Sequence, residues 1–582
     1  MIVGLIMAFN LPLATHADEA TATPAAVSAP QAKQGLFLND VRMIPIQSGG
    51  RLKPFDEFAR EAILLLTGSR SYGNFDPSEM VISMMVEPQK WLEIPIIRIS
   101  NEEVRKQLLV DPTQKFFTPH ELLKNNTFLQ YAEGITNSGS LEQVTSTGVN
   151  AVTTAKNPRI EELKRVVERV SYFQALIQGR LWAVTPPTHP NSDTPEGTTW
   201  GTLIEGMTTP TPQSQAVYEM LKAYMEGNLD LFKEKAANAR KVIEDAVPHF
   251  EQSKTKITVE VFYNVLRPFL QAMIFYLCAG ILWLLSGMHS LPRQMAKFLT
   301  VAGVAMHMVG FGLRCYVAGR PPVTNMYESI IWVSLGVMVF ATILYAKFKQ
   351  TVLMSTATIL SGLALFAADS APMLMDPTIR PLVPVLRSNY WLTIHVLTIT
   401  ASYAAYMLAM GISNTTLFMF YKKSKIESVG GETTLISQRI ATLNQLAYRA
   451  MQFGVVLLAA GTILGGVWAD YSWGRFWGWD PKEVWALIAL LVYIAILHGR
   501  FAGWVGTFAF PLWTVICFST VIMAWYGVNF VLGVGLHSYG FSNGGQASVA
   551  GFVIFQSLYC LWIVYEHRKG KTPSSSTPVA SA

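Results

Sequence analysis

The chain is short of charged residues. Of its 582 residues, 14% are Asp, Glu, Lys or Arg, whereas 51% are hydrophobic and 12% are aromatic. Soluble proteins carry roughly 25% charged residues, so the deficit excludes a wholly soluble protein and favours one that lies mostly in a membrane. The net charge of +6 does not by itself indicate a partner, because the distribution of Lys and Arg along the chain sets membrane orientation.

Cysteine is also scarce. The four cysteines lie far apart, each in an apolar run, and none belongs to a CxxC pair: Cys278, Cys315, Cys517 and Cys560. We therefore expect neither a disulfide framework nor a cysteine metal site. Small buried hydrophobic side chains are the simplest interpretation of all four.

The N-terminal part lacks the basic start that a secretory signal usually has. Residues 1–17 nevertheless contain an apolar core from Ile2 to Leu13, and we interpret them as a signal segment. Residues 18–34 are rich in Ala, Thr, Pro and Ser, which is typical of a flexible leader. Residues 35–260 have the composition of a soluble, largely helical domain without a visible catalytic constellation.

Long apolar runs follow that domain, in residues 261–569. A helix that spans a membrane needs about 20 predominantly apolar residues. The sequence contains nine candidates: 267–286, 297–317, 329–347, 352–369, 391–420, 449–468, 483–499, 507–531 and 549–566. We therefore predict a mostly α-helical, polytopic membrane protein with about nine transmembrane helices, preceded by an extracytoplasmic, largely helical domain.

The basic residues of the connections predict the orientation. Lys and Arg gather after the first, third, fifth, seventh and ninth spans, as in Lys422, Lys423 and Lys425. With nine spans these connections share one side, which the positive-inside rule makes cytoplasmic. The 35–260 domain and the 468–482 connection then face outward from the inner (cytoplasmic) membrane. Residues 570–582 form a cytoplasmic tail.

The outward connection is unusually aromatic, in the stretch YSWGRFWGWDPKEVWAL at 471–487. An interfacial aromatic belt explains one or two tryptophans, but not this whole group with its glycine gaps: Trp473, Phe476, Trp477 and Trp479. Glycine lets the backbone approach a ligand closely, so the pattern suits a large flat apolar ligand such as haem. Asp480 precedes Pro481 and Glu483 at the start of the next predicted helix, a pattern typical of a capping box. Two roles are therefore open for its side chain: a helix cap or a direct contact with the ligand.

Histidines at three positions suggest haem iron ligation. The predicted topology puts His395, in the fifth span, and His537, beyond the eighth, on the tryptophan side, where two imidazoles could share one iron. His498 lies at the inner end of the seventh span. A single membrane histidine usually makes an interhelical hydrogen bond, and this remains the favoured interpretation for His307.

Haem also carries two propionates, so cations are expected near the outer site. Arg475 lies inside the aromatic cluster and is the first candidate; the others are Lys482, Arg320, Arg380 and Arg387. Ordinary interfacial snorkelling is the alternative for each of them.

Several motifs together resemble one family. The stretch WGRFWGWDPKEVWAL resembles the tryptophan-rich WWD signature of haem-handling proteins. With NMYES at 325–329, YWLTIHV at 390–396, LHGR at 497–500 and VNFVLGVGLHSY at 528–539, it is similar to the CcsA (ResC) family of System II cytochrome c biogenesis, over residues 300–566. The GGRLKPFDEFARE stretch resembles the extracytoplasmic domain of some long members.

The resemblance implies a function. CcsA works with CcsB (ResB) to carry haem b across the membrane and attach its vinyl groups to the CXXCH cysteines of apocytochrome c, as a holocytochrome c synthase (haem lyase). By motif, His395 and His537 would be the outer axial ligands and His498 an inner-site ligand. Trp473, Trp477, Trp479 and Asp480 would belong to the outer haem platform.

The chain has no CcsB half, so a separate CcsB protein is expected. We expect neither a nucleophile from this chain nor a nucleic-acid partner. Two alternatives stay open: a WWD haem exporter or loader that delivers haem to a chaperone, and a membrane transporter or scaffold without haem.

Overall fold

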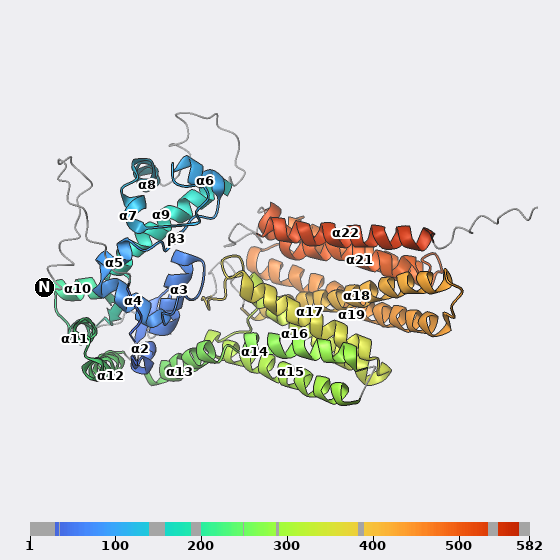
Figure 1. Cartoon of the computed structure of the whole chain (residues 1–582), viewed down its shortest axis with the longest axis horizontal. Coiled ribbons are helices and arrows are strands. Elements are labelled where there is room, and N and C mark those ends of the chain that lie inside the picture. The colour runs from blue at the N-terminus through green and yellow to red at the C-terminus, as the bar shows by residue number, and fades with distance from the viewer. Residues whose placement is uncertain are drawn as a thin grey trace, which may run out of the picture. The chain divides into compact units, whose positions relative to one another are not determined.

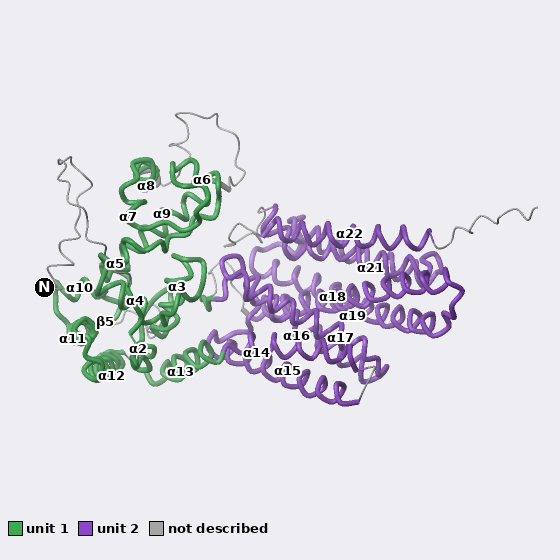
Figure 2. The backbone as a smooth tube through the Cα atoms, in the orientation of Figure 1, with its two compact units in different colours: residues 1–266, 378–381 green, residues 267–377, 382–582 purple. Residues whose placement is uncertain are grey.

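The computed structural model divides the chain into two compact units. It describes residues 30–33, 35–138, 158–187, 200–247, 250–286, 290–381, 389–532 and 545–569 (Figure 1). Unit 1 contains residues 1–266 and 378–381, and unit 2 contains residues 267–377 and 382–582 (Figure 2). The division at 266 lies close to the predicted domain end at 260, whereas the assignment of 378–381 to unit 1 was not predicted.

Unit 1 is mainly helical, with three two-stranded antiparallel ladders, β1–β2, β3–β4 and β5–β6, among its described residues. Its elements are α2 Asn39–Met43, β1 Pro45–Ser48, β2 Arg51–Pro54, α3 Phe55–Thr67, α4 Pro77–Val86, α5 Pro88–Leu92, β3 Ile97–Arg98, α6 Glu102–Gln107, β4 Phe116–Phe117, α7 Pro119–Leu123, α8 Asn126–Ser138, α9 Pro158–Ile177, β5 Ala183–Thr185, β6 Gly201–Thr202, α10 Leu203–Thr208, α11 Pro212–Glu226, α12 Leu229–Ala246 and α13 Phe250–Leu266.

Local sequence signals account for several of these boundaries. The Asp76 side chain accepts a hydrogen bond from the Ser78 backbone N–H at the start of α4. The pair α11–α12 is broken at Gly227, whose φ of 71° suits glycine, and Asn228 then caps α12. A shared hydrophobic core extends from Leu38 to Ile257 and holds these helices together.

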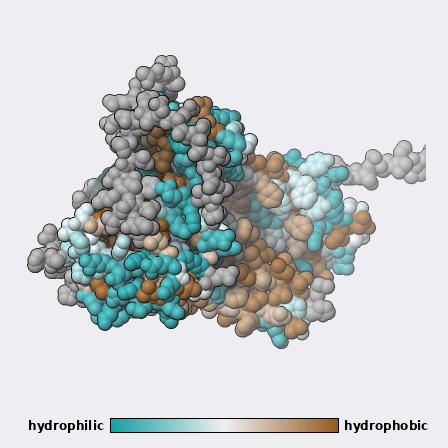
Figure 3. All heavy atoms as spheres, turned by 60° about the vertical axis from the view of Figure 1, so that its left-hand side comes forward, coloured by the Kyte–Doolittle hydropathy of each residue, from teal (hydrophilic) through white to brown (hydrophobic). Residues whose placement is uncertain are grey.

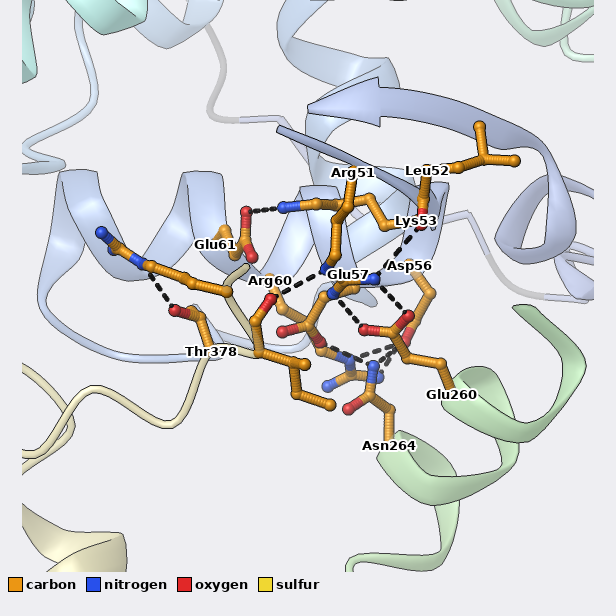
Figure 4. Close-up of polar contacts among 12 residues, drawn as sticks. Arg51, Leu52, Lys53, Asp56, Glu57, Arg60, Glu61, Glu260, Asn264 and Thr378 are labelled. Carbon is orange, nitrogen blue, oxygen red and sulfur yellow. Dashed lines mark hydrogen bonds and ion pairs between the residues drawn. The ribbon is translucent and has the colours of Figure 1, made fainter. Parts of the chain in front are cut away.

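Arg51, in the GGRLKPFDEFARE stretch, links three parts of unit 1 (Figure 4). Its guanidinium forms two parallel hydrogen bonds with Glu260 of α13, of 2.8 Å from Nη1 to Oε2 and 2.5 Å from Nη2 to Oε1. Its Nε donates to the carbonyl oxygen of Ile379 at 2.8 Å. This last bond explains why residues 378–381 belong to unit 1, although they follow a membrane-type helix in the sequence.

A second group of polar contacts surrounds the first turn of α3. Asn264 Nδ2 donates to Asp56 Oδ2 at 3.0 Å and to Glu57 Oε2 at 2.8 Å. Arg60 pairs with Asp56, and Arg70 pairs with Glu57. Burial raises the pKa of the Glu57 carboxyl, but Arg70 and the other nearby cations outweigh burial and hold this pKa below its usual range. The stretch therefore encodes a buried ionic network that joins β2 and α3 to α13.

Replacing Arg51 with alanine is expected to lower the free energy of unfolding of unit 1 by roughly 3–5 kcal/mol, because Glu260 is then buried without its partner. The Glu260 side chain is only 2% exposed. The midpoint of thermal unfolding of the full chain in detergent measures the effect. As a control, Lys106→Ala removes the exposed pair with Glu102 and should leave the midpoint unchanged. Equal midpoints for the two variants would contradict a stabilising network.

Unit 2 is a bundle of long helices. They are α14 Pro268–Leu285, α15 Ser290–Ala318, α16 Met326–Phe348, α17 Thr351–Ser370, α18 Asn389–Glu427, α19 Thr434–Trp473, α20 Pro481–Phe501, α21 Ala509–Ile522 with its π-helical continuation η4 Met523–Leu532, and α22 Gln546–Lys569. Among the described residues, nine helical segments are long and apolar enough to cross a membrane, which confirms the predicted number. In Figure 3, hydrophobic residues gather on the surface of unit 2 and hydrophilic residues on that of unit 1.

The central helices α18 and α19 pack closely through glycines. A Cβ atom at Gly461 would lie 2.8 Å from the Cα of Ile399, and one at Gly454 would lie 2.5 Å from the ring of Tyr406. In a membrane, where helices gain little from the hydrophobic effect, such small residues let backbones approach and pack. This close approach brings the first turns of α18 against the last turns of α19, where the predicted site residues lie.

Candidate functional site

A pocket opens in unit 2 between α16, α18, α19, α20 and η4, with the connection between α19 and α20 at its rim. Its lining is mainly apolar and aromatic, including Leu392, Trp468 and Trp477. Pockets for cofactors and other small molecules commonly have such a lining, with a few polar groups that fix the ligand. The lining of this pocket therefore suits a mostly apolar ligand.

His395 lies in the wall of this pocket. Its Nδ1 is 2.8 Å from the backbone carbonyl oxygen of Gly461 on α19. A carbonyl oxygen only accepts, so Nδ1 carries a proton, and in the neutral imidazole the lone pair is then on Nε2. A backbone hydrogen bond of this kind fixes the tautomer and ring orientation of histidines that ligate metals. The imidazole also lies parallel to the ring of Trp468, with centroids 6.2 Å apart and an interplanar angle of 6°.

Glycine makes room for this imidazole. A Cβ atom at Gly465 would lie 2.7 Å from His395 Cε1 and 2.9 Å from Nδ1. One at Gly466 would lie 2.6 Å from the ring of Phe476. The two consecutive glycines of α19 thus accept an imidazole and a phenyl ring against the helix backbone.

The structure divides the aromatic cluster into two groups. Phe476 and Trp477 line the pocket. Trp473 packs against Trp468, with ring centroids 4.7 Å apart, and Trp479 is 71% exposed with a left-handed φ of 57°. The helix α19 continues to Trp473 and ends at Gly474, so the connection spans residues 474–480 and is shorter than the 468–482 that the sequence suggested.

Asp480 caps α20, one of the two roles that the sequence left open. Its Oδ1 accepts from the Lys482 backbone N–H at 3.0 Å, and Glu483 Oε2 accepts from the Asp480 backbone N–H at 3.1 Å. This reciprocal arrangement is a capping box. Asp480 is 5% exposed and does not line the pocket. A direct contact between its carboxylate and a ligand is therefore not supported by the geometry.

Among the expected cations, Lys482 lines the pocket and Arg475 does not. Arg475 Nη1 lies 3.6 Å from Glu483 Oε1, and its guanidinium lies over the Trp473 ring. Arg320 is buried and pairs with Glu328. Arg380 is exposed and donates to Thr378, and Arg387 lies outside the described residues.

The other predicted histidines lie elsewhere. His498 is exposed at the end of α20, where its Nδ1 is 2.9 Å from the Ile494 carbonyl oxygen. His307 is fully buried; it forms hydrogen bonds with the Ile331 carbonyl oxygen and the Tyr276 hydroxyl, as favoured from the sequence. His537 lies outside the described residues, so its pairing with His395 stays a prediction.

Glu328, in the NMYES motif, has a role that the sequence reasoning missed. Its carboxylate is buried and accepts hydrogen bonds from Arg314 at 3.0 Å and from the backbone and side chain of Thr324 at 2.8 Å. Asn325 caps the same helix and, like Thr324, lines the pocket. A carboxylate within an apolar helix is a functional candidate by default, and that signal could have identified Glu328.

Replacing Glu328 with alanine is expected to lower the free energy of unfolding by roughly 3–5 kcal/mol, because the buried Arg314 loses its counter-charge. The variant should also lose ligand affinity, because Thr324, which lines the pocket, loses both of its hydrogen bonds to the Glu328 carboxylate. The midpoint of thermal unfolding in detergent measures the first effect. The matched control is Glu427→Ala, which removes an exposed pair with Lys423 and should not shift the midpoint. A wild-type midpoint for Glu328→Ala would refute this role.

The bundle and the pocket together define a class of protein: a multi-pass membrane protein whose pocket presents an oriented imidazole among aromatic rings. The sequence comparisons specify it further. The family model described as Cytochrome C assembly protein matches residues 323–537. A cytochrome c biogenesis protein CcsA from Synechococcus sp. is 35% identical over 283 residues, which are 44% of this chain and 89% of that relative. The chain thus belongs to the CcsA family of cytochrome c assembly proteins, as its motifs indicated.

Another relative matches more of the chain. Protein NrfI of Wolinella succinogenes is 29% identical over 518 residues, which are 84% of this chain and 53% of NrfI. The chain therefore spans about half the length of that relative, and an alignment of this length includes part of unit 1. The solved structure of the cytochrome c haem lyase CcmF covers 53% of this chain and 51% of its own, at 16% identity and a TM-score of 0.37.

Proposed function

We propose that this chain is the haem-handling subunit of a cytochrome c synthase. It moves haem b across the inner membrane and presents it to the CXXCH motif of apocytochrome c for thioether attachment. The orientation of His395 carries the proposal: its Nε2 lone pair belongs to an imidazole that is fixed in the wall of a pocket lined mainly by apolar and aromatic side chains. Membership in the CcsA family supports the assignment of haem as the ligand.

The residues that the structure describes fit haem. His395 offers a nitrogen ligand in a fixed tautomer, and the faces of Phe476 and Trp477 suit the flat macrocycle. In this proposal His537 provides the second axial nitrogen, from the connection between η4 and α22. Trp473 and Trp479 support the platform rather than line it.

The chain contributes positioning instead of a nucleophile. When bound, haem supplies two vinyl groups, and each substrate thiol adds its S–H across one C=C bond to form a thioether. The side chains of the pocket hold the ring in one place and exclude water, so the substrate meets its partner at high effective concentration. The substrate histidine can then take the place of one imidazole at the iron.

His498 supports the assignment of a second, inner site. It is exposed in the last turn of α20, seventeen residues beyond the Pro481 that opens this helix at the pocket end. In the proposal, a histidine of a separate CcsB protein completes this site from outside the chain. Unit 1 and the pocket rim then face the periplasm, and the basic connections face the cytoplasm.

The test is to produce the chain with its CcsB partner and a c-type apocytochrome in a host without a maturation system of its own. The purified complex should show a haem b absorption spectrum, and the apocytochrome should gain covalently bound haem. A colourless complex would refute haem binding. A coloured complex that leaves the apocytochrome unmodified but loads a haem chaperone would favour the exporter alternative.

A further inference from the structure

Lys482 is a basic side chain of the pocket lining, next to the acidic Glu483, and the proposed chemistry gives it no role. It is the second residue of α20, at the end of the helix where the pocket lies. Its Nζ lies 3.5 Å from Asn529 Oδ1 on η4, at the limit of a hydrogen bond. A lysine ammonium has three N–H donors and is costly to enclose without an acceptor.

The nearby acidic groups accept backbone hydrogen bonds, and the Asp480 charge also attracts the Lys482 ammonium without forming an ion pair. The Asp480 carboxylate accepts the backbone N–H of Lys482 as part of the helix cap. The Glu483 carboxylate accepts the backbone N–H groups of Gly478 and Asp480 and faces Arg475. In the part of the chain that the structure describes, no ion pair joins Lys482 to a carboxylate.

Asn529 is oriented to help the ammonium bind a ligand. Its Nδ2 donates to the Trp525 carbonyl oxygen at 3.1 Å, which directs Oδ1 toward Lys482. Asn529 and Trp525 both line the pocket. The rest of the lining between Lys482 and His395 is largely apolar and aromatic, including Leu392 and Trp477.

The pocket therefore offers an imidazole, an apolar wall and an ammonium group. We propose that Lys482, supported by Asn529, binds a carboxylate of the pocket ligand, namely a propionate of haem, and so fixes the rotation of the macrocycle about the His395–iron axis. The inference rests on the proposed function, because it assumes haem as the ligand. Propionates and vinyl groups occupy different edges of haem, so a fixed propionate determines where the vinyl groups face the substrate. Lys482 is thus a positioning residue for thioether attachment.

The test combines a protein variant with a ligand variant. The full chain with its CcsB partner is titrated with iron protoporphyrin IX and with the dimethyl ester of the same compound, which has no propionate charge. Wild-type protein should bind the ester about ten-fold or more weakly, since a hydrogen bond between charged groups is worth at least that factor. Lys482→Met should bind both compounds with the weaker affinity, and Lys482→Arg should restore most of the preference.

The matched control is Lys423→Met, which removes a lysine that pairs with Glu427 near the far end of α18. It should keep the wild-type preference. A readout beyond affinity is the yield of covalent cytochrome per bound haem, which should fall in Lys482→Met even at saturating haem because the vinyl groups are misplaced.

Three outcomes separate the inference from the proposed function. If neither compound binds wild-type protein, haem binding itself fails, and the inference fails with it. If wild-type protein binds both compounds equally well, the proposed function stands and the carboxylate subsite is refuted, whether or not Lys482→Met folds. Displacement of haem by palmitate with the same dependence on Lys482 would also overturn the inference, because the subsite would then bind a lipid carboxylate.

Discussion

His395→Ala is expected to lose haem almost completely. In our proposal the imidazole is the axial ligand that the pocket wall supplies, and alanine has no nitrogen that could bind iron or donate to the Gly461 carbonyl oxygen. Changes to the residues that merely orient a ligand already weaken metal binding roughly 10- to 100-fold, so loss of the ligand itself should exceed that range. The haem absorption per mole of purified protein measures the effect, and covalent haem on the apocytochrome should fall with it.

Two controls distinguish ligand loss from misfolding. His120→Ala removes an exposed histidine of unit 1 that pairs with Glu93 at 2.7 Å, and it should retain wild-type haem content. His395→Gly leaves a hole of the size of the side chain, so added imidazole should restore part of the haem spectrum. A His395→Ala protein with full haem content would eliminate this residue as a ligand and remove the main support for the proposed function.

The sequence predicted the membrane bundle well because its signal is strong and local. Twenty apolar residues in a row have few alternatives to a spanning helix, and the nine predicted spans correspond to nine segments in the structure. The ends of the helices were less accurate. Helix α19 starts at Thr434 and ends at Trp473, because its polar and aromatic flanks continue the helix beyond the apolar run that the prediction counted.

The sequence predicted where the site lies, but not which of the candidate residues line the pocket. The clustering of Phe476, Trp477 and His395 follows from helix order, since both segments lie at one end of the bundle. Which aromatic rings enter the pocket depends on backbone angles such as the positive φ of Trp479, and on glycines that accept a ring from another helix. These features depend on tertiary contacts, which cannot be predicted from the type of each residue alone.

The partners of charged side chains were also not predictable from the local sequence. Arg475 ranked first among the cations because it is surrounded by aromatic residues in the sequence, yet it faces Glu483, and Lys482 lines the pocket instead. Arg51 likewise joins residues that lie more than two hundred positions away along the chain, Glu260 and Ile379. Contacts between separate elements are determined by the fold, so they become visible only when the fold is known.

Gly465→Ala is expected to separate haem affinity from protein stability. Its new methyl group would stand 2.7 Å from His395 Cε1, closer than packed atoms allow, so the imidazole must move and its bond to the Gly461 carbonyl is lost. Haem affinity should fall roughly 10- to 100-fold, as for other losses of ligand orientation. Alanine favours a helix over glycine by about 0.5–1 kcal/mol, and this gain offsets part of the steric strain. The midpoint of thermal unfolding without haem should therefore change little.

The control is Gly551→Ala in α22, where a Cβ atom meets nothing within 4 Å and haem affinity should stay at the wild-type value. Wild-type haem affinity in Gly465→Ala would mean that the position of His395 against α19 does not matter for binding.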